Sequence, residues 1–253
     1  MDIYDLSGKT ALVTGGSRGI GFALSRGLAR AGATVIIANR NEEQGEDAAK
    51  RLRGEGLAVS FKAVDIGSLS SIEALFVHVE REFGGLDILL NNAAVIIRKP
   101  ALEFSEADWD ATIDINLKGT FFCSQKACEI MKKKGKGKII NVSSVLSQMC
   151  QHGRAVYSVT KAGIAHMTKA LAMEWSRFGI NVNCFGPGMT FTELNEQHFK
   201  DNPDDLAHIL SGIPLARGGV PDDYVGVAVF LASSASDYVA GQTLLVDGGM
   251  VIP

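Results

Sequence analysis

Tyr157 and Lys161 stand four residues apart in a segment with a helical hydrophobic pattern. At this spacing their side chains lie on one face of a helix, one turn apart. A lysine ammonium beside a phenol stabilises the phenolate and lowers its pKa from about 10 toward a value suited to proton transfer. The spacing therefore predicts that Tyr157 acts as a general acid or base. Ser144, thirteen residues earlier at the end of a β-branched run, is placed to hold a carbonyl oxygen beside Tyr157.

A glycine-rich run from Thr14 to Gly21 is the second chemical motif of the sequence. It follows an apolar, strand-like run and precedes a helical pattern. Gly15, Gly19 and Gly21 let the chain turn tightly and bring the backbone and a helix N-terminus close to a pyrophosphate. In this context the run predicts a dinucleotide site, and glycines that serve only a tight turn are the alternative.

The residues at the end of the second expected strand, Asn39 and Arg40, bear on the choice of dinucleotide. A site for NAD usually carries an acid there, which holds the ribose 2′-hydroxyl and would repel a 2′-phosphate. Arg40 can instead pair with that phosphate bidentately, Asn39 adds a neutral donor, and Arg18 in the glycine loop adds a second cation. We predict a preference for NADP(H) over NAD(H), the alternative being that Arg40 is a solvent-facing loop residue.

Short β-branched runs alternate with longer helical segments along the chain, a pattern typical of βαβ units and a parallel sheet. The expected strands are Thr10–Thr14, Thr34–Ala38, Val59–Ala63, Ile88–Asn91, Lys138–Ser143, Asn181–Phe185 and Thr243–Val246. The expected helices are Gly19–Ala31, Glu42–Arg53, Ser70–Phe83, Glu106–Met131, Tyr157–Phe178 and Pro221–Ser233. Continuous apolar runs such as Val35–Ile37 fit strands buried on both faces. The sequence predicts one α/β domain over residues 1–253, with a doubly wound parallel sheet of about seven strands and helices on both faces.

Charge and composition exclude several other classes of protein. The formal net charge is -3 at pH 7, which offers no clustered basic surface for nucleic acid. Apolar stretches such as Val225–Ala232 are far shorter than the roughly 20 residues of a membrane span. Four cysteines and five histidines show no metal-ligand spacing, so no metal is expected. The acidic N-terminal residues carry no secretory signal pattern, and we expect a cytoplasmic protein.

Taken together, the motifs resemble the short-chain dehydrogenase/reductase family. The glycine loop, Asn91–Ala94, Asn116, Ser144, the Tyr157 and Lys161 pair and Pro187–Gly188 stand in the order and spacing of that family, from about Leu6 to the C-terminus. The resemblance implies a Rossmann-type fold and metal-free hydride transfer between a nicotinamide and a carbonyl or secondary alcohol. It also implies a homotetramer that pairs through its long helices.

The resemblance further implies roles for single residues. Tyr157 would be the acid or base, Lys161 would bind the nicotinamide ribose and tune Tyr157, Ser144 would position the carbonyl, and Asn116 would anchor a water relay to Lys161. The implied cofactor-binding residues are Gly15, Ser17, Arg18, Gly19, Ile20, Gly21, Asn39, Arg40, Asp65, Ile66, Asn92, Ala93, Ala94, Tyr157, Lys161, Pro187, Gly188, Thr190 and Thr192. Ala94 departs from the glycine that is usual in the family. Ser143 competes with Ser144, but alternation along a strand points it the other way.

The fold alone does not identify the substrate, so the substrate class is inferred from the residues of the loops around the expected nicotinamide. The expected substrate residues are Ile96, Arg98, Ser144, Gln148, His152 and Met189, with a lid over residues 188–219. Arg98, Lys99, His152 and Arg154 supply positive charge that suits a sugar acid, although all four can also be rim residues in water.

Stretches such as Val95–Pro100 are similar to gluconate 5-dehydrogenases and 2-deoxy-gluconate 3-dehydrogenases. The alternatives are a 3-oxoacyl-acyl-carrier-protein reductase, a general carbonyl reductase that acts on a more lipophilic ketone, and a non-catalytic cofactor-binding protein.

Overall fold

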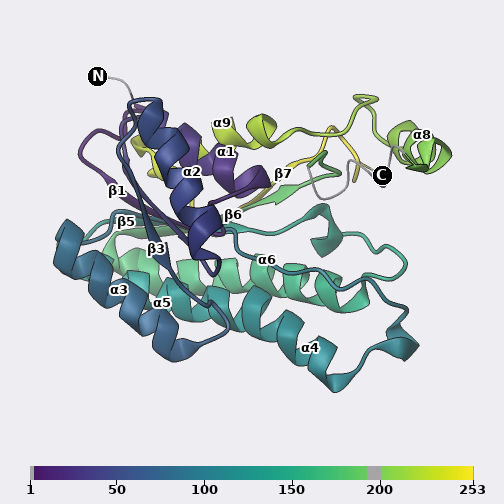
Figure 1. The fold of residues 1–253 in the computed structure, drawn as a ribbon, viewed down its shortest axis with the longest axis horizontal. Coiled ribbons are helices and arrows are strands. Elements are labelled where there is room, and N and C mark those ends of the chain that lie inside the picture. Colours follow the sequence, from purple (N-terminus) through teal and green to yellow (C-terminus); the bar gives the residue numbers. More distant parts are fainter. Residues whose placement is uncertain (1–2, 193–200, 253) are drawn as a thin grey trace.

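Buried β-branched runs form one parallel sheet in the computed structural model, which describes residues 3–192 and 201–252 (Figure 1). The strands are β1 (Thr10–Thr14), β2 (Thr34–Asn39), β3 (Val59–Ala63), β4 (Ile88–Asn91), β5 (Gly137–Val142), β6 (Ile180–Pro187) and β7 (Thr243–Val246). Their order across the sheet is β3-β2-β1-β4-β5-β6-β7, and each neighbouring pair is parallel. The predicted doubly wound α/β sheet is confirmed.

Helices cover both faces of the sheet, because successive strand residues point to opposite sides. The helices are α1 (Gly19–Arg30), α2 (Glu42–Gly54), α3 (Leu69–Phe83), α4 (Glu106–Ile113), α5 (Thr120–Lys134), α6 (Ala155–Trp175), α8 (Pro203–Ser211) and α9 (Val225–Ala232). Helices α1, α2 and α9 pack on one face with Val35 and Ile37 of β2, whereas α3, α5 and α6 pack on the other face with Ile36 (Figure 1). Two hydrophobic cores therefore hold the sheet rigidly between them.

The long helix expected over 106–131 is not uniform. Between α4 and α5 the chain takes a π-helical form from Asp114 to Gly119. A π-helical turn widens the helix by one residue and is common at functional sites. Here it carries Asn116, whose side chain hydrogen-bonds to the backbone of Val95 instead of facing solvent. The local sequence gives no periodicity signal for this widening, because its cause lies in a contact 21 residues away.

Two other helical segments also differ from expectation. Helix α6 begins at Ala155, two residues before Tyr157, and a 3-10 turn over Ser176–Phe178 follows its last residue. The helix expected from Pro221 opens with a 3-10 turn over Pro221–Tyr224 before α9 begins. The residues described contain no helix whose length and apolar character match a membrane span.

The strands present their carboxyl ends at one edge of the sheet. Thr14 at the end of β1 pairs in register with Ala38 of β2 and with Asn91 of β4, and Asn91 pairs with Asn141 of β5. The order in which strands are added to the sheet reverses between β1 and β4, since β2 and β3 lie on one side of β1 and the later strands lie on the other. In open α/β sheets, ligands bind outside the carboxyl ends of the strands at such a switch point.

Candidate active site

The loop between β1 and α1 is shaped by its glycines. Gly15 and Gly19 have φ of 65° and 52°, a region that L side chains rarely adopt. A Cβ on Gly15 would lie 2.9 Å from the Cα of Ala93, and one on Gly21 would lie 2.1 Å from the Gly15 carbonyl oxygen. The loop can therefore be this tight only with glycine at these positions. It leaves the N-terminus of α1 open toward a cavity at the edge of the sheet.

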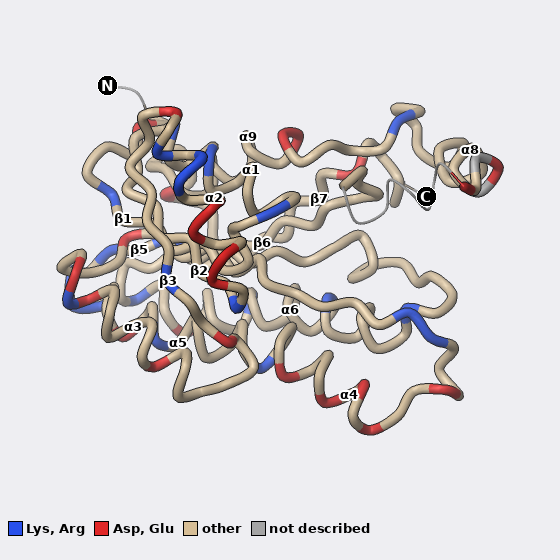
Figure 2. Tube along the Cα trace, viewed as in Figure 1, with Lys and Arg blue, Asp and Glu red and all other residues tan. Residues whose placement is uncertain are grey.

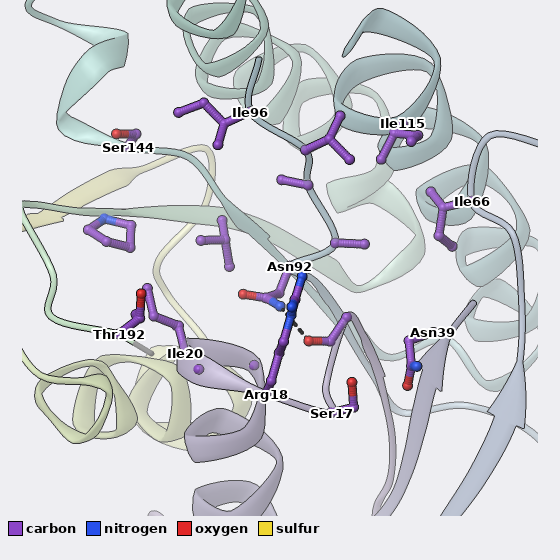
Figure 3. Close-up of a pocket in the computed structure, with 18 of the residues that line it drawn as sticks. Ser17, Arg18, Ile20, Asn39, Ile66, Asn92, Ile96, Ile115, Ser144 and Thr192 are labelled. Carbon is purple, nitrogen blue, oxygen red and sulfur yellow. Dashed lines mark hydrogen bonds between the residues drawn. The ribbon is translucent and has the colours of Figure 1, made fainter. Parts of the chain in front are cut away.

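The turn after β4 holds the glycine loop in place. Asn92 donates from Nδ2 to the carbonyl oxygens of Thr14 at 3.1 Å and Gly15 at 3.0 Å. In return, the Thr14 hydroxyl accepts from the backbone N–H groups of Asn92 and Ala93. Figure 3 shows Asn92 directly beside the loop. These four bonds hold together two segments that both line the cavity.

A cavity of about 580 Å³ opens at this edge. All of the residues expected to bind a dinucleotide line it, from Gly15 in the glycine loop to Thr192 after β6. Sequence reasoning missed several further lining residues: Asn41, Gln44, Val64, Val95, Ile115, Val142 and Ser143. They carry no motif and reach the cavity only because separate chain segments pack together. The cavity is elongated, with Asn39 and Ser144 at its opposite ends (Figure 3).

The Asn39 end of the cavity is rich in hydrogen-bond donors and positive charge. Arg18 and Arg40 are both exposed, and neither is paired with a carboxylate of the described residues. Arg18 extends from the loop across the cavity (Figure 3). Asn39 donates from Nδ2 to the Asn41 carbonyl oxygen at 2.7 Å, while its Oδ1 is buried without a partner. This end suits an anionic ligand that also offers a hydroxyl or amine donor.

At the other end of the cavity lie Ser144, Tyr157 and Lys161. The Lys161 side chain is buried, and its Nζ donates to the Val142 carbonyl oxygen at 2.8 Å. Burial lowers the pKa of Lys161 to about 8, because the ammonium loses hydration. The structure separates the two neighbouring serines as alternation predicts. Both serines line the first cavity, but Ser143 donates from Oγ to the Lys161 carbonyl oxygen at 2.8 Å, whereas Ser144 also lines the adjoining second cavity with Tyr157.

The electrostatics of Tyr157 differ from the expectation. Burial raises the pKa of its phenol to about 12, and the cation that opposes this shift is Arg154, followed by a side-chain hydrogen bond with Ser144. Lys161 was expected to lower the pKa of Tyr157, but its Nζ lies 5.4 Å from the ring centroid and is turned to the Val142 carbonyl. Because Lys161 is not among the groups that shift this pKa here, its expected effect on Tyr157 stays a prediction. The spacing of four residues placed the two side chains together but did not fix where the ammonium points.

Asn116 lies behind the cavity and does not line it. Its Oδ1 accepts from the Val95 N–H at 2.8 Å, and its Nδ2 donates to the Val95 carbonyl oxygen at 2.9 Å and the Thr160 hydroxyl at 3.3 Å. The side chain is fully buried. Asn116 therefore ties the segment after β4 to α6, and so fixes Val95 relative to Tyr157.

A second cavity, of about 700 Å³, adjoins the first. The two share Ile96, Ser144, Tyr157, Gly188 and Thr190 in their walls. The other residues that line the second cavity are Arg98, Val145, Leu146, Met149, Gln151, Arg154, Met189, His208, Ile209, Gly212 and Met250. Both cavities have the size of a ligand site, and Tyr157 and Ser144 lie in the wall that they share.

Comparisons with known proteins agree with this geometry. Residues 15–251 match a family model described as enoyl-(acyl carrier protein) reductase. The chain is 39% identical to gluconate 5-dehydrogenase of Gluconobacter oxydans (strain 621H) over 251 residues, which cover 99% of this chain and 98% of that protein. It is 41% identical to 2-dehydro-3-deoxy-D-gluconate 5-dehydrogenase of Escherichia coli (strain K12) over 252 residues, with 98% of each covered. The chain belongs to the short-chain dehydrogenase/reductase family.

A solved structure of the family carries the same fold. The gluconate 5-dehydrogenase from Burkholderia cenocepacia J2315, in complex with NADP and tartrate, is 40% identical and superposes with a TM-score of 0.94. The match covers 98% of this chain and 97% of that chain. The resemblance predicted from the motifs is confirmed. As a short-chain dehydrogenase/reductase, the protein is an NAD(P)-dependent oxidoreductase that acts on CH–OH groups.

The structure places the expected substrate residues in two groups. Ile96, Arg98, Ser144 and Met189 line the second cavity. Gln148 and His152 are exposed and are not among the described residues that line it, so their contact with a substrate stays a prediction. A 3-10 turn over Val145–Ser147 redirects the chain after β5, and it is Met149, Gln151 and Arg154 that reach the cavity. Of the expected lid over 188–219, residues 193–200 lie outside the described residues.

Proposed function

We propose that this short-chain dehydrogenase/reductase transfers a hydride between NADP(H) and a carbonyl or secondary alcohol of a gluconate-type sugar acid. The observation that carries the proposal is the junction of the two cavities at Ser144 and Tyr157. Two relatives of about 40% identity are named for dehydrogenation of gluconate or a deoxygluconate derivative. A structural neighbour holds NADP together with tartrate, a small hydroxy acid.

The first cavity fits the dinucleotide. The glycine loop leaves room for a pyrophosphate where a Cβ at Gly21 would collide with the backbone, and the N-terminus of α1 favours its negative charge. Arg18 and Arg40 would hold the 2′-phosphate, and the buried Oδ1 of Asn39 would accept from the adenosine. Lys161 and the Pro187 to Thr192 segment would hold the nicotinamide end. When bound there, the nicotinamide gives or takes the hydride.

The side chains of the enzyme handle the proton. In the reductive direction the Tyr157 Oη–H transfers its proton to the carbonyl oxygen, while the Ser144 hydroxyl donates a hydrogen bond that orients this oxygen. The C=O bond becomes a C–O–H group, and the phenolate that remains is stabilised by Arg154 and Ser144. In the oxidative direction the phenolate takes the same proton back. Burial raises the pKa of Tyr157 to about 12, so at neutral pH the phenol carries the proton that carbonyl reduction consumes.

Charge in the second cavity supports an anionic substrate. Arg98 and Arg154 line it, and its described wall contains neither aspartate nor glutamate. A long acyl chain or a neutral ketone would leave these two guanidinium groups without a partner. The sugar acid is therefore favoured over the acyl thioester and the lipophilic ketone.

We also propose that the enzyme works as a homotetramer. Helix α6 exposes two large apolar side chains, Met173 at 87% and Val159 at 52% of their surface. Covering them by a second copy of the chain would remove this apolar surface from water. A monomeric mass in solution at micromolar protein would contradict the assembly.

One plate assay of nicotinamide absorbance tests the function. NADPH and NADH are each combined with 5-keto-gluconate, a 3-keto sugar acid, an acetoacetyl thioester and a neutral diketone. We expect turnover of a keto sugar acid with a preference for NADPH. Turnover of the thioester alone would move the enzyme to acyl-chain reduction. Tight NADPH binding without turnover of any ketone would point to a non-catalytic protein.

A further inference from the structure

Four residues near the second cavity are expected from the sequence to be cationic or able to become so, and the structure distinguishes them. His208, which was not among them, also lines this cavity. Lys99 is already paired, since its Nζ lies 2.7 Å from the Asp108 Oδ2. This contact holds the pKa of Asp108 at about 2, so the carboxylate remains charged and bound at neutral pH. Asp108 belongs to α4, whose charged positions are acidic (Figure 2). His152 is exposed and lies outside the cavity wall. Arg98 and Arg154 are the two that remain.

Arg154 is the more unusual of these two arginines. Its side chain is partly buried, and its Nη1 is inaccessible to solvent without any hydrogen-bond partner. Buried polar groups in folded proteins are nearly always hydrogen-bonded, so a buried unpaired guanidinium nitrogen calls for a partner. Burial, and next the Arg98 charge, lower the pKa of Arg154, but a guanidinium keeps its proton even so. The protein thus holds two like charges close together, and one of them is poorly hydrated.

The backbone holds the two arginines together. The Lys99 N–H, directly after Arg98, donates to the carbonyl oxygen of Gly153, directly before Arg154, at 3.2 Å. Gly153 has a φ of 71°, a conformation that glycine adopts without strain. This single bond joins the segment after β4 to the turn before α6. The juxtaposition of Arg98 and Arg154 is therefore built into the fold and does not depend on side-chain rotamers alone.

Arg154 and Tyr157 face the same cavity. Arg154 is the residue before the first turn of α6, and Tyr157 follows three positions later, so both side chains leave the same face of the helix. Both line the second cavity. An anion held by Arg154 would consequently lie in the same chamber as a carbonyl group at the tyrosine hydroxyl. Among the side chains that the structure describes (3–192, 201–202, 204 and 206–252), no acidic one lines this chamber.

We propose that Arg154, assisted by Arg98, binds the carboxylate of the substrate and selects anionic ketones over neutral ketones of the same size. The inference rests on the proposed sugar-acid function and names the residue that would confer it. A guanidinium binds a carboxylate through two parallel N–H donors, which fixes the orientation of the substrate as well as its charge. Binding would also provide the buried Nη1 with an acceptor.

The test compares R154Q and R154K with wild type and with R177Q, an exposed arginine at the far end of the same helix region. For each protein, kcat and KM are measured for 5-keto-gluconate and for a neutral keto sugar, with NADPH affinity measured by fluorescence titration. In R154Q, we expect KM for the acid alone to rise about 10- to 100-fold, as the loss of a charged hydrogen bond predicts. We expect kcat to fall by a similar factor for both ketones, because Arg154 also stabilises the Tyr157 phenolate. The ratio of acid to neutral ketone turnover falls at least about tenfold. R154K restores part of this ratio, R177Q leaves it unchanged, and NADPH affinity is retained throughout.

Two outcomes distinguish a failure of the proposed carboxylate subsite at Arg154 from a failure of the proposed sugar-acid function. If R154Q keeps the acid-to-neutral ratio of wild type, the subsite is refuted while the sugar-acid function stands. If wild type reduces no keto sugar acid, the proposed function fails, and the subsite is then judged by calorimetric binding of tartrate in the presence of NADPH. Tartrate binding that R154Q weakens about tenfold or more supports the subsite. Equal tartrate binding by both proteins refutes it.

Discussion

Replacing Arg40 by alanine tests the assignment of the dinucleotide most directly. Arg40 lines the Asn39 end of the first cavity and is free of any carboxylate partner in the part of the chain that the structure describes. Removing its side chain therefore breaks no internal ion pair. Any loss of affinity reports on the ligand, and only NADP(H) carries the phosphate that Arg40 is expected to meet.

The size of the effect follows from exposure. A hydrogen bond to a charged group is worth about 1.5–3 kcal/mol, and an exposed pair falls at or below the lower end because water and salt screen it. R40A should therefore weaken NADPH binding about tenfold and change NADH binding by less than about twofold. Arg18 remains as a second cation, so the double variant R18A/R40A should weaken NADPH binding about 100-fold.

Fluorescence titrations of NADPH and NADH at low and high salt provide the assay. The wild-type preference for NADPH should narrow as salt increases, because screening acts on the phosphate contact. K50A is the matched control, since Lys50 is an exposed α2 cation that lines neither cavity. Equal losses for both cofactors in R40A, or no loss for either, would refute the 2′-phosphate assignment.

Three further predictions concern the catalytic pair and the glycine loop. Y157F should lower kcat about 10²- to 10⁴-fold with NADPH affinity retained. A decrease in kcat of less than about tenfold would refute the assignment of Tyr157 as the general acid. Burial lowers the pKa of Lys161 from 10.5 to about 8, so between these pH values the unfolded chain holds a proton that the folded chain has lost. The free energy of unfolding of wild type should therefore rise with pH over this range relative to K161M in urea titrations, and parallel curves would contradict the burial argument. G21A should weaken NADPH binding by more than about tenfold in the same fluorescence titration, because its Cβ would meet the Gly15 carbonyl oxygen at 2.1 Å and one lost charged phosphate contact already accounts for that factor. Unchanged affinity in G21A would mean that the loop can relax.

The amino-acid sequence determined the fold class and the dinucleotide loop of this protein. Val35–Ile37 and Ile88–Leu90 are apolar throughout because both faces of their strands are buried, and this signal is local. The glycines at 15, 19 and 21 are equally informative, since each is required by a backbone conformation or a close approach within the loop. The residues expected around the cofactor line one cavity because the strand ends that carry them meet at one edge of the sheet.

Tertiary structure alone decided the features that depend on contacts between distant segments. The π-helical turn contains Asn116, whose side chain hydrogen-bonds to Val95, and the hydrophobic periodicity of the segment does not predict it. The four-residue spacing brought Lys161 near Tyr157, but the Val142 carbonyl decided where its ammonium points. Of the four residues expected to carry positive charge, Lys99 is paired with Asp108, whereas Arg154 lines the second cavity with a partly buried guanidinium. The sequence gives the number and type of charged residues. Packing sets how well each is hydrated and whether it is paired, and so decides which charged groups can bind a ligand.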